Sequence, residues 1–210
     1  MVDKLNIGVF ASGRGSNFLA ILQAIKQGRI TNAEIALVIS NKADAGALEI
    51  ARSNNIPAAH LDQKQFTSED EFTKALILIL DEYCVNFIVL AGYLKKLSPA
   101  IIRRFRNRIV NIHPALLPAF GGKGMYGLRV HEAVIACGAR ISGASVHIVD
   151  EEYDHGPVVL QRTVEVAGDE TPETLAQKVL NVEHGLYAEA IRLFAEGKVK
   201  VNGQSVTILS

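Results

Sequence analysis

The stretch "NFIVLAG", residues 86–92, decides the fold class of this chain. Its apolar residues follow one another without the polar alternation of a strand that has one solvated face. A continuous apolar run of this length predicts a strand that is buried on both faces, as in a parallel sheet covered by helices.

Upstream of this stretch, short apolar runs alternate with helical patterns. The predicted strands are 5–11, 34–40 and 57–61, and the predicted helices are 16–27, 45–55 and 69–83. Ser68 and Glu71 form a capping box before the last of these helices. This order predicts an α/β fold: a doubly wound, mostly parallel, Rossmann-like sheet with right-handed crossovers.

The half downstream has a mixed character. We expect strands at 108–113, 142–149 and 157–166, and helices at 128–137 and 172–196, the second capped by Thr171. Asn202-Gly203 predicts a final hairpin. The sequence shows no repeat, low-complexity segment or linker, so we expect residues 1–210 to form a single domain.

Composition limits the function. The 22 basic and 22 acidic residues cancel, which disfavours a polynucleotide as the main partner. No apolar run approaches the roughly 18 residues of a membrane span, and "MVDKLNIGVFASGRG" does not resemble a signal peptide, so we expect a cytoplasmic protein. Cys84 and Cys137 form no C-x-x-C pair and are expected to be buried, reduced thiols.

The segment "SGRGSN", residues 12–17, predicts a phosphate site, because glycines follow a strand and precede a helix start. It is neither a Walker A loop nor G-x-G-x-x-G, since Phe18 occupies the third glycine position, and this favours a single phosphate over a dinucleotide. A structural turn with Ser16 as the helix cap is the alternative.

Asn111 and His113 lie two residues apart at the end of a predicted strand, so both side chains face one side. An amide and an imidazole there can stabilise a developing oxyanion or move a proton. The alternative is a histidine that is merely hydrogen-bonded. Pro114 and Pro118 restrict the segment that follows.

Two carboxylates also stand out. Asp154 lies in the acidic loop 149–157, just before Gly156-Pro157, where one carboxylate can point inward; otherwise this is a solvated loop. A metal site with His147 and His155 is disfavoured, because no ligand spacing supports it. Glu183 falls inside the apolar arc of the helix 175–194 and therefore needs a partner, which is either a structural contact or a ligand.

Six motifs together resemble the folate-dependent phosphoribosylglycinamide formyltransferase family in order and spacing, nearly end to end. They are "SGRGSN" (12–17), "SNKADA" (40–45), "VLAGYLKKLSP" (89–99), "NIHPALLP" (111–118), "SVHIVDEEYDHGPVVLQ" (145–161) and "EHGLYAEAI" (183–191). The resemblance implies formyl transfer from 10-formyltetrahydrofolate to the amine of glycinamide ribonucleotide in purine (IMP) biosynthesis. It implies no metal, nucleic acid or membrane partner, and a monomer or homodimer.

Carried over by position, the resemblance also implies roles for individual residues. The catalytic residues would be Asn111, His113 and Asp154. The N-terminal half would hold the ribonucleotide phosphate through Gly15, Ser16 and Asn17, and Glu183 would bind the ribose. The folate would contact Leu94, Lys95, Lys96 and Leu97 and, in the C-terminal half, Asp150, Glu151, Glu152 and Tyr153.

Some features depart from the family pattern. The family commonly has an arginine at the position of Lys95 and another near Glu69, early in the third predicted helix. Lysine cannot reproduce bidentate contacts to a carboxylate or phosphate. The glycine-rich loop after Pro118 is longer, and Lys123, Arg129 and His131 can supply charge there. A formyltetrahydrofolate hydrolase, a formyltransferase with another acceptor, and a noncatalytic folate- or nucleotide-binding module remain as alternatives.

Overall fold

The computed structural model describes residues 3–210. The chain divides into two compact units, one ending at Val110 and one running from Asn111 to Ser210. Strand β5, Ile109–His113, starts in the first unit and ends in the second.

The first unit is built on parallel strands in the order β3-β2-β1-β4. The strands are β1 (Leu5–Phe10), β2 (Ala33–Ser40), β3 (Ala58–His60) and β4 (Phe87–Leu90). All four residues of β4 are buried, as the continuous apolar run predicts. Strand β4, on which the prediction of a buried parallel sheet rests, is therefore covered on both faces.

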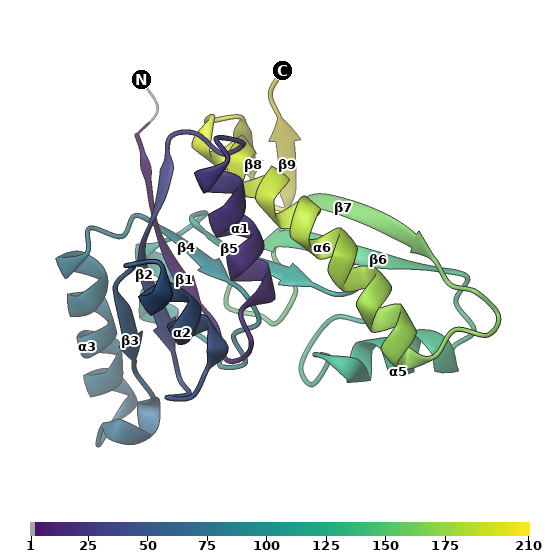
Figure 1. Cartoon of the computed structure of the whole chain (residues 1–210), viewed down its shortest axis with the longest axis horizontal. Coiled ribbons are helices and arrows are strands. Elements are labelled where there is room, and N and C mark those ends of the chain that lie inside the picture. The colour runs from purple at the N-terminus through teal and green to yellow at the C-terminus, as the bar shows by residue number, and fades with distance from the viewer. Residues whose placement is uncertain (1–2) are drawn as a thin grey trace. The chain divides into compact units, whose positions relative to one another are not determined.

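Helices of the first unit alternate with these strands (Figure 1). They are α1 (Ser16–Lys26), α2 (Gly46–Ser53), the short η1 (Gln63–Gln65), α3 (Glu69–Glu82) and α4 (Pro99–Arg104). Phe10 and Phe18 are fully buried in this unit. Burial of a side chain of this size contributes roughly 1.5–3 kcal/mol, so such residues fix how helix and strand meet.

The second unit contains the end of β5 and the antiparallel pair β6 (Ile141–Ile148) and β7 (Val158–Glu165). Its long helix α6 (Pro172–Ala195) runs along β6 and β7 and also packs against α5 (Leu128–Ala136) (Figure 1). A separate hairpin joins β8 (Val199–Asn202) to β9 (Ser205–Ile208).

The predicted α/β class, with parallel strands first and an antiparallel pair later, is confirmed. The caps at Ser68 and Thr171 are also present, and Thr171 forms a full capping box with Thr174. At Ser68 only half of the expected box exists, since the Glu71 carboxylate turns instead to the backbone and hydroxyl of Thr67. The sequence did not predict α4 or η1, which are too short for a periodic pattern.

The expectation of buried cysteines is wrong, because Cys84 and Cys137 are both exposed. Each lies where a helix ends at the surface: Cys84 follows α3 with a φ of 50°, and Cys137 is the C-cap of α5. Within residues 3–210, none of the helices has the length and apolar character needed to cross a membrane.

Candidate active site

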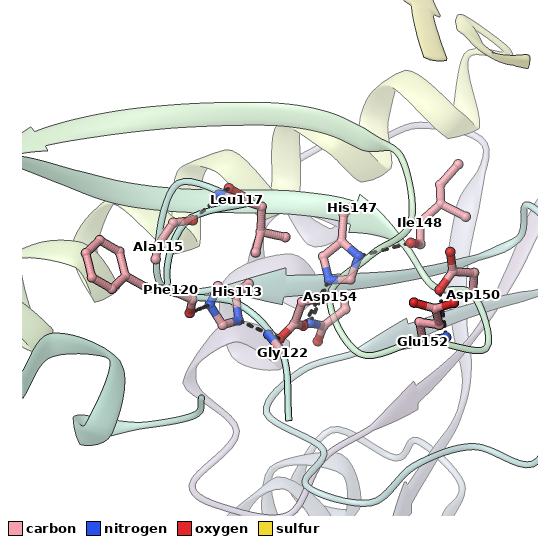
Figure 2. Close-up of polar contacts among 12 residues, drawn as sticks. His113, Ala115, Leu117, Phe120, Gly122, His147, Ile148, Asp150, Glu152 and Asp154 are labelled. Atoms are coloured by element: carbon pink, nitrogen blue, oxygen red, sulfur yellow. Dashed lines mark hydrogen bonds and ion pairs between the residues drawn. The ribbon is translucent and has the colours of Figure 1, made fainter. Parts of the chain in front are cut away.

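A polar cluster in the second unit contains all three predicted catalytic residues. Asn111 and His113 come from β5, and Asp154 comes from the loop between β6 and β7. The Asp154 carboxylate lies between two imidazoles, with Oδ2 3.5 Å from His113 Nδ1 and Oδ1 3.5 Å from His147 Nε2 (Figure 2). The fold thus brings together residues that are 43 positions apart from first to last, Asn111 to Asp154.

His147 orients the amide of Asn111. Asn111 Nδ2 and His147 Nε2 are 3.0 Å apart, while His147 Nδ1 is 2.9 Å from the carbonyl oxygen of Ile148. A carbonyl can only accept, so Nδ1 carries the hydrogen and Nε2 accepts from the amide. This contact uses one of the two N–H bonds of the Asn111 amide.

His113 is nearly buried, with 3% of its surface exposed. Its Nε2–H donates to the carbonyl oxygen of Phe120 at 2.8 Å, which turns Nδ1 toward Asp154. Burial lowers the pKa of His113, and this outweighs the Asp154 charge and the Phe120 carbonyl, which both favour the protonated form. The charge of Asp154 therefore raises the His113 pKa, but burial, which lowers it, is the larger influence.

Asp154 has an unusual backbone conformation, with a φ of 54°. Its Oδ2 accepts a hydrogen bond from the Gly122 N–H at 2.9 Å, which ties it to the glycine-rich loop. Burial by itself would raise the pKa of Asp154, but the charge of a protonated His113 and the hydrogen bond from the Gly122 N–H lower it. The group is thus held as a carboxylate.

The segment after His113 is fixed by one buried hydroxyl. Ser145 Oγ donates to the Ala115 carbonyl at 2.7 Å and accepts from the Leu117 N–H at 2.9 Å. Gln161 Nε2 bonds both Ser145 Oγ and the Leu117 carbonyl, at 2.8 and 2.9 Å. These contacts supplement the prolines, which cannot donate backbone hydrogen bonds.

Two further polar residues of this unit are buried. Glu183 on α6 is 8% exposed, as the helical wheel predicts, and it takes part in polar or electrostatic contacts. His131 on α5 is 3% exposed, and among the described residues its Nδ1 has no hydrogen-bond partner. Burial lowers the pKa of His131, and the neighbouring His113 lowers it further.

In the first unit, the predicted phosphate loop connects β1 to α1. Gly15 is the N-cap of α1, with a φ of 81°, so the alternative of Ser16 as cap is wrong. A Cβ on Gly15 would lie 2.8 Å from the Cα of Ala47, where α2 begins. The loop is therefore packed against α2, and no other residue fits at this position.

The residues predicted to contact folate lie in two segments, one in each unit. Leu94, Lys95 and Lys96 are exposed, whereas Leu97 is buried. Ser12 accepts a hydrogen bond from the Leu94 N–H at 3.0 Å, which fixes this segment beside the phosphate loop. In the second unit, Glu151, Glu152 and Tyr153 are exposed and Asp150 is half-buried.

Sequence reasoning missed three partners of the predicted catalytic residues. The sequence offered His147 only as a ligand of a disfavoured metal site, and not as a partner of Asn111. Phe120 and Gly122 act through their backbones, which no residue-type pattern reports. A buried histidine in an apolar strand was the signal available for His147.

A family model described as formyl transferase matches residues 5–191. The chain therefore belongs to the formyl transferase family. It is 43% identical over 207 residues to the chloroplastic phosphoribosylglycinamide formyltransferase of Arabidopsis thaliana, covering 98% of this chain and 70% of the relative. It is 38% identical over 198 residues to the phosphoribosylglycinamide formyltransferase of Escherichia coli (strain K12), covering 94% and 91%.

A solved structure agrees with these relatives. The crystal structure of glycinamide ribonucleotide transformylase 1 from Symbiobacterium toebii superposes with a TM-score of 0.92 and is 41% identical, covering 99% of this chain and 95% of that one. The whole α/β arrangement is thus shared with a transformylase.

Proposed function

We propose that this chain transfers the formyl group of 10-formyltetrahydrofolate to the amine of 5'-phosphoribosylglycinamide, giving N-formylglycinamide ribonucleotide and tetrahydrofolate in IMP biosynthesis. The names of the relatives support this assignment over a hydrolase or a noncatalytic module. The observation that carries it is the single polar cluster in which Asn111, His113 and Asp154 meet.

The cluster suits attack of an amine on a formyl carbon. The nitrogen lone pair adds to this carbon, and negative charge develops on the formyl oxygen. The remaining N–H of Asn111 stabilises that charge. His113, once it is protonated and turned from the Phe120 carbonyl toward the substrate, supplies a second donor, and loss of one such donor costs roughly 2.7–4 kcal/mol. The bond to N10 of the folate then breaks, and the amine proton passes to N10 through a water ordered by Asp154.

The substrates would be bound by residues of the phosphate loop, of helix α6 and of two exposed segments. We propose that Gly15, Ser16 and Asn17 hold the phosphate at the start of α1, where the helix dipole and backbone N–H groups favour an anion. Glu183 would accept hydrogen bonds from the ribose hydroxyls. The folate would contact two segments, 94–97 and 150–153.

The organisation of the enzyme is also part of the proposal. We propose that residues 1–210 work as one formyltransferase domain, as a cytoplasmic monomer or homodimer whose partners are the two small substrates. The name of the Arabidopsis thaliana relative places that protein in the chloroplast. Sedimentation of the purified chain would decide between monomer and dimer.

The test is a spectrophotometric assay of tetrahydrofolate release, with and without the ribonucleotide, on wild type and Asp154→Asn. We expect release only when the ribonucleotide is present, and its collapse in the variant. Asp81→Asn, which breaks an exposed ion pair with Arg104, is the control and should retain activity. Release without the ribonucleotide would indicate a hydrolase, and no release at all would indicate a binding protein or another acceptor.

A further inference from the structure

The loop that carries Asp154 is bridged by a second ion pair that the proposed chemistry does not use. Asp150 Oδ2 lies 2.7 Å from His155 Nδ1, and Asp150 Oδ1 accepts the Glu152 N–H at 2.9 Å. The carboxylate of Asp150 therefore joins the start of the loop to the residue directly after Asp154. We call the Asp150–His155 pair the loop clamp.

A backbone hydrogen bond also joins the two ends of the loop, where it meets β6 and β7. The Ile148 N–H donates to the Pro157 carbonyl at 2.9 Å, which is the last backbone contact before the loop. A Cβ on Gly156 would lie 2.0 Å from the Ile148 carbonyl oxygen, so only glycine fits beside that strand end. The backbone is thus fixed at Gly156, and the loop clamp is the next constraint toward Asp154.

Asp154 needs such a constraint. Its φ of 54° lies in the left-handed region, which costs free energy for a residue with a Cβ, although aspartate tolerates it better than most residues. Contacts on both sides of Asp154 therefore help to hold this conformation. On one side the Gly122 N–H holds the Asp154 carboxylate. On the other side the adjoining residue is His155, whose side chain is held by Asp150 (Figure 2 shows Asp150 within the same loop, next to Glu152).

We propose that His155 is a positioning residue: through the loop clamp it holds Asp154 in its left-handed conformation, with the carboxylate facing His113. This inference rests on the proposed function and deepens it. His155 does not touch the reacting atoms, and it acts through the backbone that it shares with Asp154.

The acidic side chains around His155 favour its protonated form, which strengthens the loop clamp. The hydrogen bond and charge of Asp150 raise the pKa of His155, and Glu152 adds to the effect. The clamp is therefore strongest when His155 is protonated. His155 is half exposed, so solvent weakens the pair, and we expect a modest effect on the rate.

The first test compares His155→Phe with His155→Asn. Phenylalanine removes the donor, while asparagine places an amide N–H close to the position of Nδ1. Exposed ion pairs contribute little, so we expect kcat in His155→Phe to fall only about 1.4- to 5-fold, with the KM for folate little changed. His155→Asn should recover most of the loss. Asp150 itself is left unchanged, because it is proposed to contact folate.

A double-mutant cycle shows whether the effect passes through Asp154. In the Asp154→Asn background, His155→Phe should cause no further fall in kcat. Glu189→Gln is the matched control, since it breaks the Arg162–Glu189 pair of 2.7 Å and similar exposure in the same unit. An equal loss in both backgrounds, or an unchanged kcat in His155→Phe, would overturn the proposal.

A second readout needs no activity. The pKa of His113, followed by NMR, should fall further in His155→Phe, because Asp154 would no longer raise it. It should stay constant in Glu189→Gln. If wild type releases no tetrahydrofolate, the proposed function fails, but this titration still decides the role of His155: an unchanged His113 pKa in His155→Phe rejects it.

Discussion

Asn111 donates to His147 Nε2 across 3.0 Å, and this contact, not the strand alone, sets which way the amide points. His147 can accept because its own Nδ1–H is bound to the Ile148 carbonyl. Replacing His147 by phenylalanine removes the acceptor and frees the amide to rotate. We expect kcat to fall about tenfold, equivalent to about 1.4 kcal/mol, with little change in either KM. Steady-state kinetics would measure this, and an unchanged kcat would show that Asn111 is held by other contacts.

Gly121 lies where a side chain would press on Asp154, the proposed catalytic carboxylate. A Cβ there would lie 2.6 Å from Leu117 Cδ2 and 3.2 Å from Asp154 Cβ. We expect Gly121→Ala to lower kcat several-fold. The free energy of unfolding should fall by only a small fraction of its wild-type value. Gly168→Ala is the control, because nothing lies within 4 Å of its added Cβ. Equal kcat values for the two variants would show that the loop yields without moving Asp154.

Ser145 and Ser142 form a matched pair on β6. Both are buried, but Ser145 Oγ makes three hydrogen bonds, whereas Ser142 Oγ has no partner among the residues that the structure describes. We expect Ser145→Ala to lower the free energy of unfolding by about 1–3 kcal/mol, since the Leu117 N–H is left unpaired. Ser142→Ala should be neutral or stabilising. Urea unfolding of both variants tests this, and equal losses would contradict it.

The free energy of unfolding should fall when the pH is lowered from 7.5 to 5.5. Burial lowers the pKa of His113 and of His131 below the ordinary 6.5. Below 6.5 the unfolded chain binds protons that the folded chain does not, so stability decreases as pH falls toward the folded pKa. Each such group contributes at most about 1.4 kcal/mol per pH unit. The pKa of His155 is raised, so its contribution to stability increases as the pH falls. Because His155 is exposed, this opposing contribution is small.

His131→Phe provides the check on this pH dependence. The variant lacks one of the two buried groups but keeps a ring in the same place. Urea unfolding at pH 7.5 and 5.5 should show a smaller loss in the variant than in wild type. A loss of the same size in both proteins would mean that other groups cause the pH dependence.

Local patterns predicted much of this site. The two-residue period placed Asn111 and His113 on one side of a strand, and the helical wheel placed Glu183 among apolar neighbours. Both are properties of one element and need no tertiary information. The inward position of Asp154 was predicted only as one option, because it depends on how its loop is held.

The contacts that orient these residues could not be predicted in the same way. The pairing of Asn111 with His147 depends on which residues of β5 and β6 come together, and the bonds to Phe120 and Gly122 use backbone groups that every residue has. The exposed cysteines show a similar limit: an apolar context predicted burial, but each residue ends a helix at the surface.

All groups proposed to act on the reacting atoms lie between Asn111 and Asp154, whereas the proposed phosphate loop lies at residues 12–17, in the other unit. The proposed catalytic residues and the proposed phosphate loop are therefore encoded in separate parts of the gene. Substitutions in the first segment are therefore expected to change the affinity for the phosphate, while the groups proposed to act on the formyl carbon stay the same.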